Sequence, residues 1–140
     1  MRIYLACTVR GDRAAIPILQ ETLARLEQYG HEVFTGHLLR DDVEEFEAAL
    51  PSIAVYERDV RWLHACDVVV AEASGSSYGV GFEVGYVLGR SDKSGQRVFL
   101  LYDSARRPFI SRLIPGNTHP NCVSFGYRDA AEVRAFIDHH

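Results

Sequence analysis

The residues from 68 to 85 carry the types that could do chemistry: Val-Val-Val-Ala-Glu-Ala-Ser-Gly-Ser-Ser-Tyr-Gly-Val-Gly-Phe-Glu-Val-Gly. The apolar start, Val68 to Ala71, is typical of a strand buried on both faces, as in a parallel sheet. Serines and glycines from 74 to 81 then form a turn, and the residues after Gly79 read as the start of a helix. Unpaired backbone N–H groups and the helix dipole favour an anion at such a place.

Glu83 is the acidic residue that follows this turn. With a helix starting near Val80, Glu83 lies in the first turn. We expect the helix dipole and the unpaired N–H groups to hold its carboxyl group ionised. An ionised carboxylate beside an anion site can serve as a nucleophile. A solvent-facing acid would also suit a first helical turn. Against that, the apolar neighbours indicate a largely buried helix: Val80, Phe82, Val84 and Val87.

Asp59 is a second carboxylate in an unusual position. It lies in a predicted helix from Ser52, which we expect to cap it, to about Cys66. The apolar face of this helix is expected to be Ile53, Tyr56, Val60 and Leu63. Asp59 lies beside that face, where an unpaired carboxylate is costly to bury. It therefore pairs with a neighbour such as Arg58 or Arg61, or it takes part in chemistry.

Hydrophobic periodicity predicts the elements that position these groups. Strand-like runs cover residues 2–7, 31–35, 68–71, 97–102 and 122–126. Helical spacing covers residues 12–29, with Gly30 as its C-terminal glycine, and also 42–50, 52–66, 80–90 and 129–139. We expect loops at 36–42, 91–96, 103–108 and 115–120, with one or two helical turns at 109–114.

Strands that alternate with helices imply an α/β fold: a single-domain three-layer sandwich with a five-stranded parallel sheet, in the flavodoxin-like order 2-1-3-4-5. Ligands bind outside the carboxyl ends of such strands, where strands 1 and 3 diverge. The turn from Thr8 to Gly11 then faces the turn from 74 to 81 across one pocket. Arg10 either is an ordinary surface charge or points over this edge to hold a phosphate.

The composition excludes several classes of function. The 140 residues, 47% of them hydrophobic, suit one domain with a core. A net charge of −4 without a basic run argues against a nucleic acid polymer as partner, although a small phosphorylated ligand fits. Three scattered cysteines indicate neither a disulfide framework nor a zinc site. With no leader or membrane span in view, we expect a soluble cytoplasmic protein.

The turn matches neither the G-x-x-x-x-G-K-[ST] motif nor a complete G-x-G-x-x-G motif. A glycine turn alone also serves a tight connection between strand and helix. Cys7 has the context of a small buried hydrophobe rather than a nucleophile. His37 is by itself typical of an ordinary polar residue.

Five segments together resemble the 2′-deoxynucleoside 5′-phosphate N-hydrolases, known as Rcl proteins, which belong with the nucleoside 2-deoxyribosyltransferases. The segments are Met-Arg-Ile-Tyr at 1–4, Thr-Val-Arg-Gly at 8–11, Asp-Val-Arg-Trp-Leu at 59–63, Ala-Cys-Asp-Val-Val-Val-Ala-Glu at 65–72 and Ser-Tyr-Gly-Val-Gly-Phe-Glu-Val-Gly at 77–85. The resemblance implies one nucleoside deoxyribosyltransferase-like domain over residues 1–140. It also implies a homodimeric enzyme that cleaves the N-glycosidic bond of a deoxynucleoside monophosphate without a metal or organic cofactor.

The resemblance assigns roles residue by residue. The carboxylate nucleophile falls on Glu83, the second acidic residue on Asp59, and a catalytic tyrosine on Tyr4. The implied substrate-binding residues are Thr8, Val9, Arg10, Gly11, His37, Ser77, Gly79, Gly81 and Ser111. Ser111 is expected to reach the phosphate of the neighbouring subunit. Cys7-Thr8 replaces the family's frequent Gly-Ser, and residues 38–50, which border the base in this fold, match little.

The implied mechanism resembles retaining glycoside hydrolysis. Glu83 attacks C1′ as the base leaves, Asp59 donates or relays a proton, and water resolves the glycosyl ester. A deoxyribosyltransferase acting on unphosphorylated nucleosides would use the same ester with a free base as acceptor. A cytokinin-activating phosphoribohydrolase would need a Pro-Gly-Gly-x-Gly-Thr run, which is missing. A non-catalytic nucleotide-binding domain would be marked by a lost carboxylate, yet both carboxylates are present.

Overall fold

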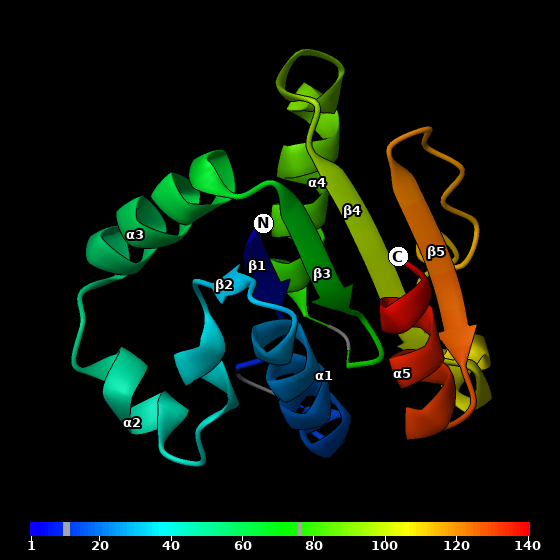
Figure 1. Ribbon diagram of the computed structural model, residues 1–140. Helices are drawn as coiled ribbons and strands as arrows, with labels where there is room; N and C mark the ends of the chain where they lie inside the picture. The colour runs from blue at the N-terminus through cyan, green and yellow to red at the C-terminus, as the bar shows by residue number, and fades with distance from the viewer. Residues whose placement is uncertain (10–11, 76) are drawn as a thin grey trace.

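A five-stranded parallel sheet forms the centre of the computed structural model, which describes residues 1–9, 12–75 and 77–140 (Figure 1). Its strands are β1 (Arg2–Ala6), β2 (Glu32–Val33), β3 (Val68–Glu72), β4 (Arg97–Asp103) and β5 (Cys122–Tyr127). They lie in the order β2-β1-β3-β4-β5, and every neighbouring pair is parallel. The predicted order is therefore confirmed, and β3 is buried along its whole length.

Helices cover both faces of the sheet, as the three-layer prediction requires. The helices are α1 (Ile16–Gln28), α2 (Val43–Ala48), α3 (Ser52–Ala65), α4 (Tyr78–Ser94) and α5 (Ala130–His139). On one face α1 and α5 pack against alternate strand residues such as Ile3, Val70 and Leu101. On the other, α3 and α4 pack against the intervening residues, such as Tyr4 and Val69. Alternation of side chains along each strand thus builds two apolar layers.

The first helix starts later than its periodicity predicted. It begins at Ile16 rather than at Asp12, with a proline in its first turn, where a fixed φ suits a helix start. Asp12 instead turns the chain, because its Oδ1 accepts a hydrogen bond from the Ala14 N–H at 2.9 Å. Gly30 has φ of 82°, which confirms its predicted place at the helix C-terminus.

The segment after α1 is less strand-like than predicted. β2 has two residues rather than the run from 31 to 35. The Thr35 hydroxyl replaces the backbone hydrogen bonds that a longer β2 would make to β1. It accepts from the Leu5 N–H at 2.8 Å and donates to the Leu5 carbonyl at 2.6 Å. The expected loop at 36–42 contains a 3-10 helix, η1 (Gly36–Leu39), in which Leu38 and Leu39 are buried.

The predicted apolar face of α3 is wrong in its N-terminal half. Leu63 is fully buried, but Ile53 is 66% exposed and Tyr56 is 56% exposed. Ser52 does not cap the helix as predicted, because Pro51 occupies the N-cap position and Ser52 is the first helical residue. Only the C-terminal end of α3 lies against the sheet; its other end extends toward α2 (Figure 1).

α4 is longer than the predicted 80–90 at both ends. It begins at Tyr78 and ends at Ser94, where Gly95 adopts φ of 74°. The expected exposed loop from 91 to 96 is therefore wrong for residues 91–94, which are helical, although residues 92–95 are exposed as predicted. The side chain of Gln96 is buried, and its Nε2 donates to the carbonyls of Leu63 at 2.6 Å and Cys66 at 2.8 Å.

The short helix expected at 109–114 lies earlier in the chain. A 3-10 helix, η2 (Ser104–Phe109), follows β4 directly, and Asp103 caps it by accepting from the Ala105 N–H at 3.0 Å. This replaces the loop predicted for 103–108. Across the three ranges that the structure describes, no helix has both the length and the apolar character that crossing a bilayer requires.

Candidate active site

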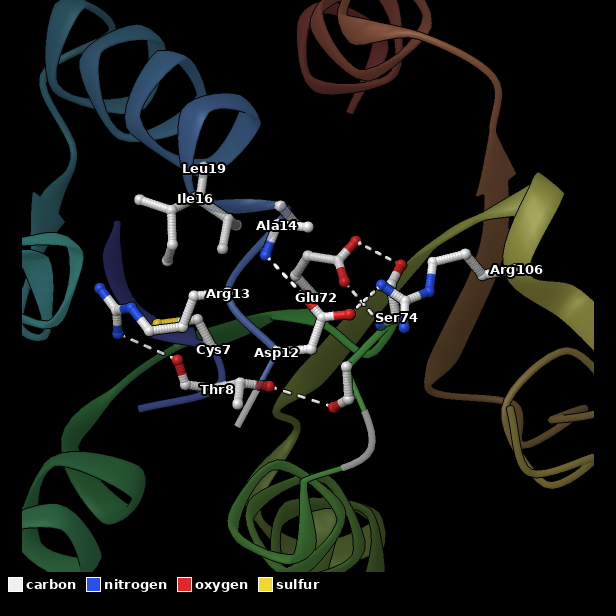
Figure 2. A pocket seen from close by; sticks show the side chains of 12 residues that line it. Cys7, Thr8, Asp12, Arg13, Ala14, Ile16, Leu19, Glu72, Ser74 and Arg106 are labelled. Carbon is white, nitrogen blue, oxygen red and sulfur yellow. Dashed lines mark hydrogen bonds and ion pairs between the residues drawn. The ribbon is translucent and has the colours of Figure 1, made fainter. Parts of the chain in front are cut away.

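Two turns meet at the carboxyl ends of β1 and β3, as the strand order predicted. The Thr8 hydroxyl donates to the Gly75 carbonyl at 3.1 Å, which joins the turns directly (Figure 2). Gly75 is packed so closely that a Cβ there would lie 2.5 Å from the Asp12 carbonyl oxygen and 3.0 Å from the Thr8 Oγ1. Contact between the turns therefore depends on a residue without a side chain.

A buried carboxylate, Glu72, braces the start of the glycine turn. It is 3% exposed and accepts hydrogen bonds from the Ser74 N–H at 2.5 Å, the Ser74 hydroxyl at 3.1 Å and the Tyr127 hydroxyl at 2.6 Å. The Ser74 Oγ in turn accepts from the Asp103 N–H at 2.7 Å. Burial raises the pKa of Glu72, and these donors partly oppose the shift. Sequence analysis missed this brace, whose only signal is an acid at the end of a buried strand.

Two arginines fix the turn after β1. Arg13 donates to the Thr8 carbonyl at 3.0 Å and to the Leu38 carbonyl at 3.0 Å, so it joins this turn to η1. Arg106 of η2 forms an ion pair with Asp12 (Figure 2). The predicted ligands Arg10 and Gly11 lie outside the described residues, and their roles stay predictions.

The N-terminus of α4 carries the predicted anion-binding residues. Ser77 is its N-cap, and its Oγ accepts from the Val80 N–H at 3.3 Å. A Cβ on Gly79 would lie 3.7 Å from the Ser77 Oγ and 4.0 Å from the Glu83 Oε1. The Glu83 carboxylate therefore reaches back along the helix toward its N-terminus.

Glu83 and Asp59 line one cavity of about 610 Å³, which we call the carboxylate cavity. Val9 and Cys7 contribute from the β1 side, and Glu47 and Arg58 from α2 and α3. The structure thus brings together the two acids that sequence analysis singled out. Within the described ranges, no three His, Cys, Asp or Glu side chains are grouped in a way that suits a metal ion.

The pKa of Glu83 contradicts the expectation that the helix field holds this group ionised. Burial, and next the charge of Asp59, raise it from the ordinary 4.5 to about 8, while Tyr4 opposes the shift. Because α4 starts at Tyr78, Glu83 lies in the second turn, and the dipole effect falls off beyond the first. Burial therefore outweighs the field.

Tyr4 lies near both carboxylates, and its side chain is fully buried. Burial raises the pKa of its phenol, as do the charges of Glu83 and Asp59, so the hydroxyl keeps its proton. Within the described residues it has no hydrogen bond of normal geometry, although it lies near enough to Glu83 to affect the pKa of that acid. The hydroxyl is thus a donor available to an ionised Glu83.

Asp59 has a partner, and that partner is one of the two that sequence analysis considered. Arg58 Nε donates to the Asp59 Oδ1 at 2.9 Å, and Arg58 Nη2 donates to the Glu47 Oε1 at 2.9 Å. Burial raises the pKa of Asp59, whereas Arg58 lowers it. Sequence analysis gave no role to Glu47, which lies 11 residues before Arg58 on a different helix.

The other predicted ligands occupy different places. The ring of His37 contacts Glu47, with the His37 Nε2 2.8 Å from the Glu47 Oε1. Gly81 and Ser111 line a second cavity of about 490 Å³, and Ser77 borders it from the N-cap. This cavity contains neither Glu83 nor Asp59, so Ser111 and the two acids do not share a cavity within one chain.

Comparison with known proteins gives a consistent family. The model of the nucleoside 2-deoxyribosyltransferase family matches residues 3–128. A relative from Thermofilum pendens, provisionally named 2′-deoxynucleoside 5′-phosphate N-hydrolase 1, is 39% identical over 138 residues, 99% of this chain and 93% of the relative. The 5-hydroxymethyl-dUMP N-hydrolase of Danio rerio is 36% identical over 115 residues, 81% of this chain and 74% of that protein.

Among solved structures, the CMP N-glycosidase of Clostridium botulinum superposes with a TM-score of 0.71 at 20% identity, covering 99% of this chain and 98% of that one. At 20% identity, this structural similarity supports the fold assignment of the present chain. The family match spans both turns, both carboxylates and the whole of the sheet apart from the first residue of β1. The chain therefore belongs to the nucleoside 2-deoxyribosyltransferase family.

Proposed function

We propose that this protein is a nucleotide N-glycosidase that hydrolyses 2′-deoxynucleoside 5′-monophosphates to free base and deoxyribose 5-phosphate. One observation carries the proposal: a Cβ built on Gly79 would lie 4.0 Å from the Glu83 Oε1. Gly79 follows the N-cap residue Ser77 by two residues. A reactive carboxylate and a helix N-terminus suited to phosphate thus lie on adjacent turns of one helix. The names of the two relatives, both N-hydrolases of nucleotides, support the same reading.

The proposed reaction has two steps. In the first, ionised Glu83 attacks C1′ of the sugar while the C1′–N bond breaks, and the bonding electrons leave with the base. Asp59 supplies a proton to the departing base. In the second step, water attacks C1′ of the glycosyl ester and gives a proton to the Asp59 carboxylate, the C1′–O bond to Glu83 breaks, and Glu83 leaves as a carboxylate. The Tyr4 hydroxyl stabilises the ionised Glu83.

We also propose that a second copy of the chain covers the second cavity. The rim of this cavity exposes large apolar side chains, with Tyr78 at 99% and Leu113 at 81% exposure. Exposed apolar patches of this kind mark interaction surfaces. Ser111 lies on the same rim, so a homodimer would bring Ser111 of the partner subunit toward the α4 N-terminus, where the phosphate is placed.

We propose a cytoplasmic location, which the cysteine chemistry supports. Cys7, Cys66 and Cys122 are all free thiols in the structure. Thiols persist in a reducing compartment. Burial raises the pKa of Cys7 to about 12, so this thiol is a poor nucleophile although it lines the carboxylate cavity.

Base release from matched substrates tests the proposed function. The panel pairs each deoxynucleoside with its 5′-monophosphate, includes the ribonucleotides, and is read by chromatography of the free base. We expect turnover of the monophosphates and little turnover of the nucleosides. A clear preference for nucleosides, with transfer to an added free base, would instead establish the deoxyribosyltransferase. Binding without any release would identify a nucleotide-binding domain.

Ser77→Ala separates phosphate recognition from folding. Removal of the hydroxyl should raise KM for the monophosphate about tenfold, which corresponds to one lost hydrogen bond to a charged group. It should also lower the free energy of unfolding by about 1 kcal/mol through loss of the cap. Asp129→Ala is the matched control, because Asp129 caps α5 in the same way, with its Oδ1 2.9 Å from the Glu132 N–H. An equal rise in KM in both variants would contradict a phosphate role for Ser77.

A further inference from the structure

A chain of four polar side chains starts at Asp59, continues through Arg58 and Glu47 in the wall of the carboxylate cavity, and ends at His37. Asp59 contacts Arg58, Arg58 contacts Glu47, and the Glu47 Oε1 also lies 2.8 Å from the His37 Nε2. These side chains are largely buried, with exposed fractions of 20% for Asp59, 14% for Arg58 and 11% for Glu47. They join η1, α2 and α3, three elements that each contribute residues to the wall of the cavity.

Arg58 is held in place by more than its ion pairs. Its guanidinium lies over the ring of Trp62, 5.0 Å from the ring centre, and that ring stacks on Phe34 at 6.2 Å. Two of its nitrogens, Nε and Nη2, donate to two different carboxylates. An arginine fixed in this way presents its N–H groups in a rigid geometry, which a lysine does not.

We propose that Arg58 and Glu47 are positioning residues for Asp59: Arg58 fixes the direction of the Asp59 carboxylate, and Glu47 holds the Arg58 guanidinium through a second ion pair. The proposal rests on the function assigned above to Asp59. Arg58 carries a positive charge in direct contact with Asp59, and it favours the ionised form. Glu47 disfavours that form by its own charge.

Charged and titratable groups lie near Asp59 on several of the described elements, including Tyr4 of β1, whose pKa is raised by the charge of Asp59. On α3 these are Asp59's neighbour Arg58, on α2 Glu47, on η1 His37, and on α4 Glu83, whose own pKa is raised by the charge of Asp59. Glu47 also keeps a buried oxygen, Oε2, that has no hydrogen-bond partner among the described residues. An unpaired buried oxygen costs stability, so Glu47 is better explained by its effect on Arg58 and Asp59 than by a contribution to folding.

The test is a carboxyl titration that needs no substrate. The side-chain ¹³C signal of Asp59, identified by its loss in Asp59→Asn, is followed against pH in the wild type, Arg58→Gln, Glu47→Gln and Arg61→Gln. We expect the midpoint to rise by about one pH unit or more in Arg58→Gln, since a contacting charge is lost. It should fall in Glu47→Gln. Arg61→Gln is the control, an exposed arginine on the same helix that should leave the midpoint unchanged.

Activity supplies a second readout with a defined sign. A general acid must be protonated, so activity is lost as pH rises through its pKa. The limb of the kcat profile that is set by the pKa of Asp59 should therefore move to higher pH in Arg58→Gln and to lower pH in Glu47→Gln. Arg58→Lys keeps the positive charge but loses the fixed geometry of the guanidinium. It should leave this limb of the kcat profile near its wild-type pH. We expect kcat to fall about 10- to 100-fold, because the Asp59 carboxyl group is misplaced.

Opposite shifts in the two glutamine variants would support the proposal. Shifts of the same sign, or no shift, would overturn it, because a merely structural role does not predict opposite directions. Should Arg58→Gln fail to fold, Glu47→Gln and Arg58→Lys carry the same test. If the titration behaves as expected and no nucleotide releases its base, then the proposed function fails while the coupling of Arg58 and Glu47 to Asp59 stands.

Discussion

Glu83→Gln is expected to lower kcat for base release by on the order of 10³-fold or more, the scale found when a nucleophile is removed. Glutamine keeps the shape of the side chain, but its amide cannot form the glycosyl ester. Rapid-quench detection of a labelled sugar on the protein should show the ester in the wild type and none in the variant. Glu57→Gln, an exposed glutamate of α3, should behave as the wild type.

The same substitution should stabilise the folded protein at alkaline pH. The pKa of Glu83 is about 8 in the folded chain, against an ordinary value of 4.5. Between these values the unfolded chain loses the proton that the folded chain keeps, so each rise in pH favours unfolding. This penalty is absent below 4.5 and complete above about 8. Glu83→Gln lacks it, and its advantage over the wild type in urea unfolding should grow across that window.

The two results together separate catalysis from folding. An inactive but more stable variant locates the lost activity in the chemistry of Glu83. Unchanged base release in Glu83→Gln would show that another group attacks the sugar. A stability difference that does not change with pH would show that the carboxyl group titrates in the folded state as it does in the unfolded chain.

The hydrophobic pattern of each segment was sufficient to predict the strands and their order, because each strand is marked by its own apolar run. The buried run at 68–71 and the alternation of strands and helices predicted the order β2-β1-β3-β4-β5 without knowledge of any contact. The errors lie where a distant partner decides the structure. Thr35 ends β2 through its bonds to Leu5, and Gln96 is buried because it binds carbonyls at the end of α3.

The site shows the same division. Ser77, Gly79 and Glu83 lie close together in sequence, so their types and spacing predicted their proximity. Glu72 and Glu47 were missed, because their partners Tyr127 and Arg58 lie on other elements. The sign of the Glu83 pKa shift was also missed. Desolvation by neighbouring elements determines it, and a helix considered alone has no such neighbours.

Gly75→Ala is expected to reduce both stability and activity, since the two turns of the site meet at this residue. The φ of Gly75 is not positive, so the backbone there suits alanine, and the expected effect is a steric clash. The new Cβ would lie 2.5 Å from the Asp12 carbonyl oxygen. That oxygen cannot move freely, because the Asp12 side chain is held by Ala14 and by Arg106.

Relief of this contact requires the two turns to separate, which breaks the hydrogen bond from Thr8 to Gly75 and displaces the chain leading to Ser77. We expect the free energy of unfolding to fall by about 1–3 kcal/mol, the cost of overpacking a tight site. We expect kcat/KM to fall about 100-fold, because a displacement of this size misplaces the substrate against Glu83. Both are measured by urea unfolding and steady-state base release.

Gly89→Ala is the matched control for this prediction. Gly89 is an exposed residue of α4. Apart from the adjacent helix backbone, no atom of the described residues lies within 4 Å of where its Cβ would be, so alanine should keep activity and raise stability by about 0.5–1 kcal/mol through its higher helix propensity. The two variants add the same methyl group and differ only in the space around it. If Gly75→Ala is as stable and as active as Gly89→Ala, then the turns do not depend on close contact, and the positions of Ser77 and Glu83 are fixed by α4 alone.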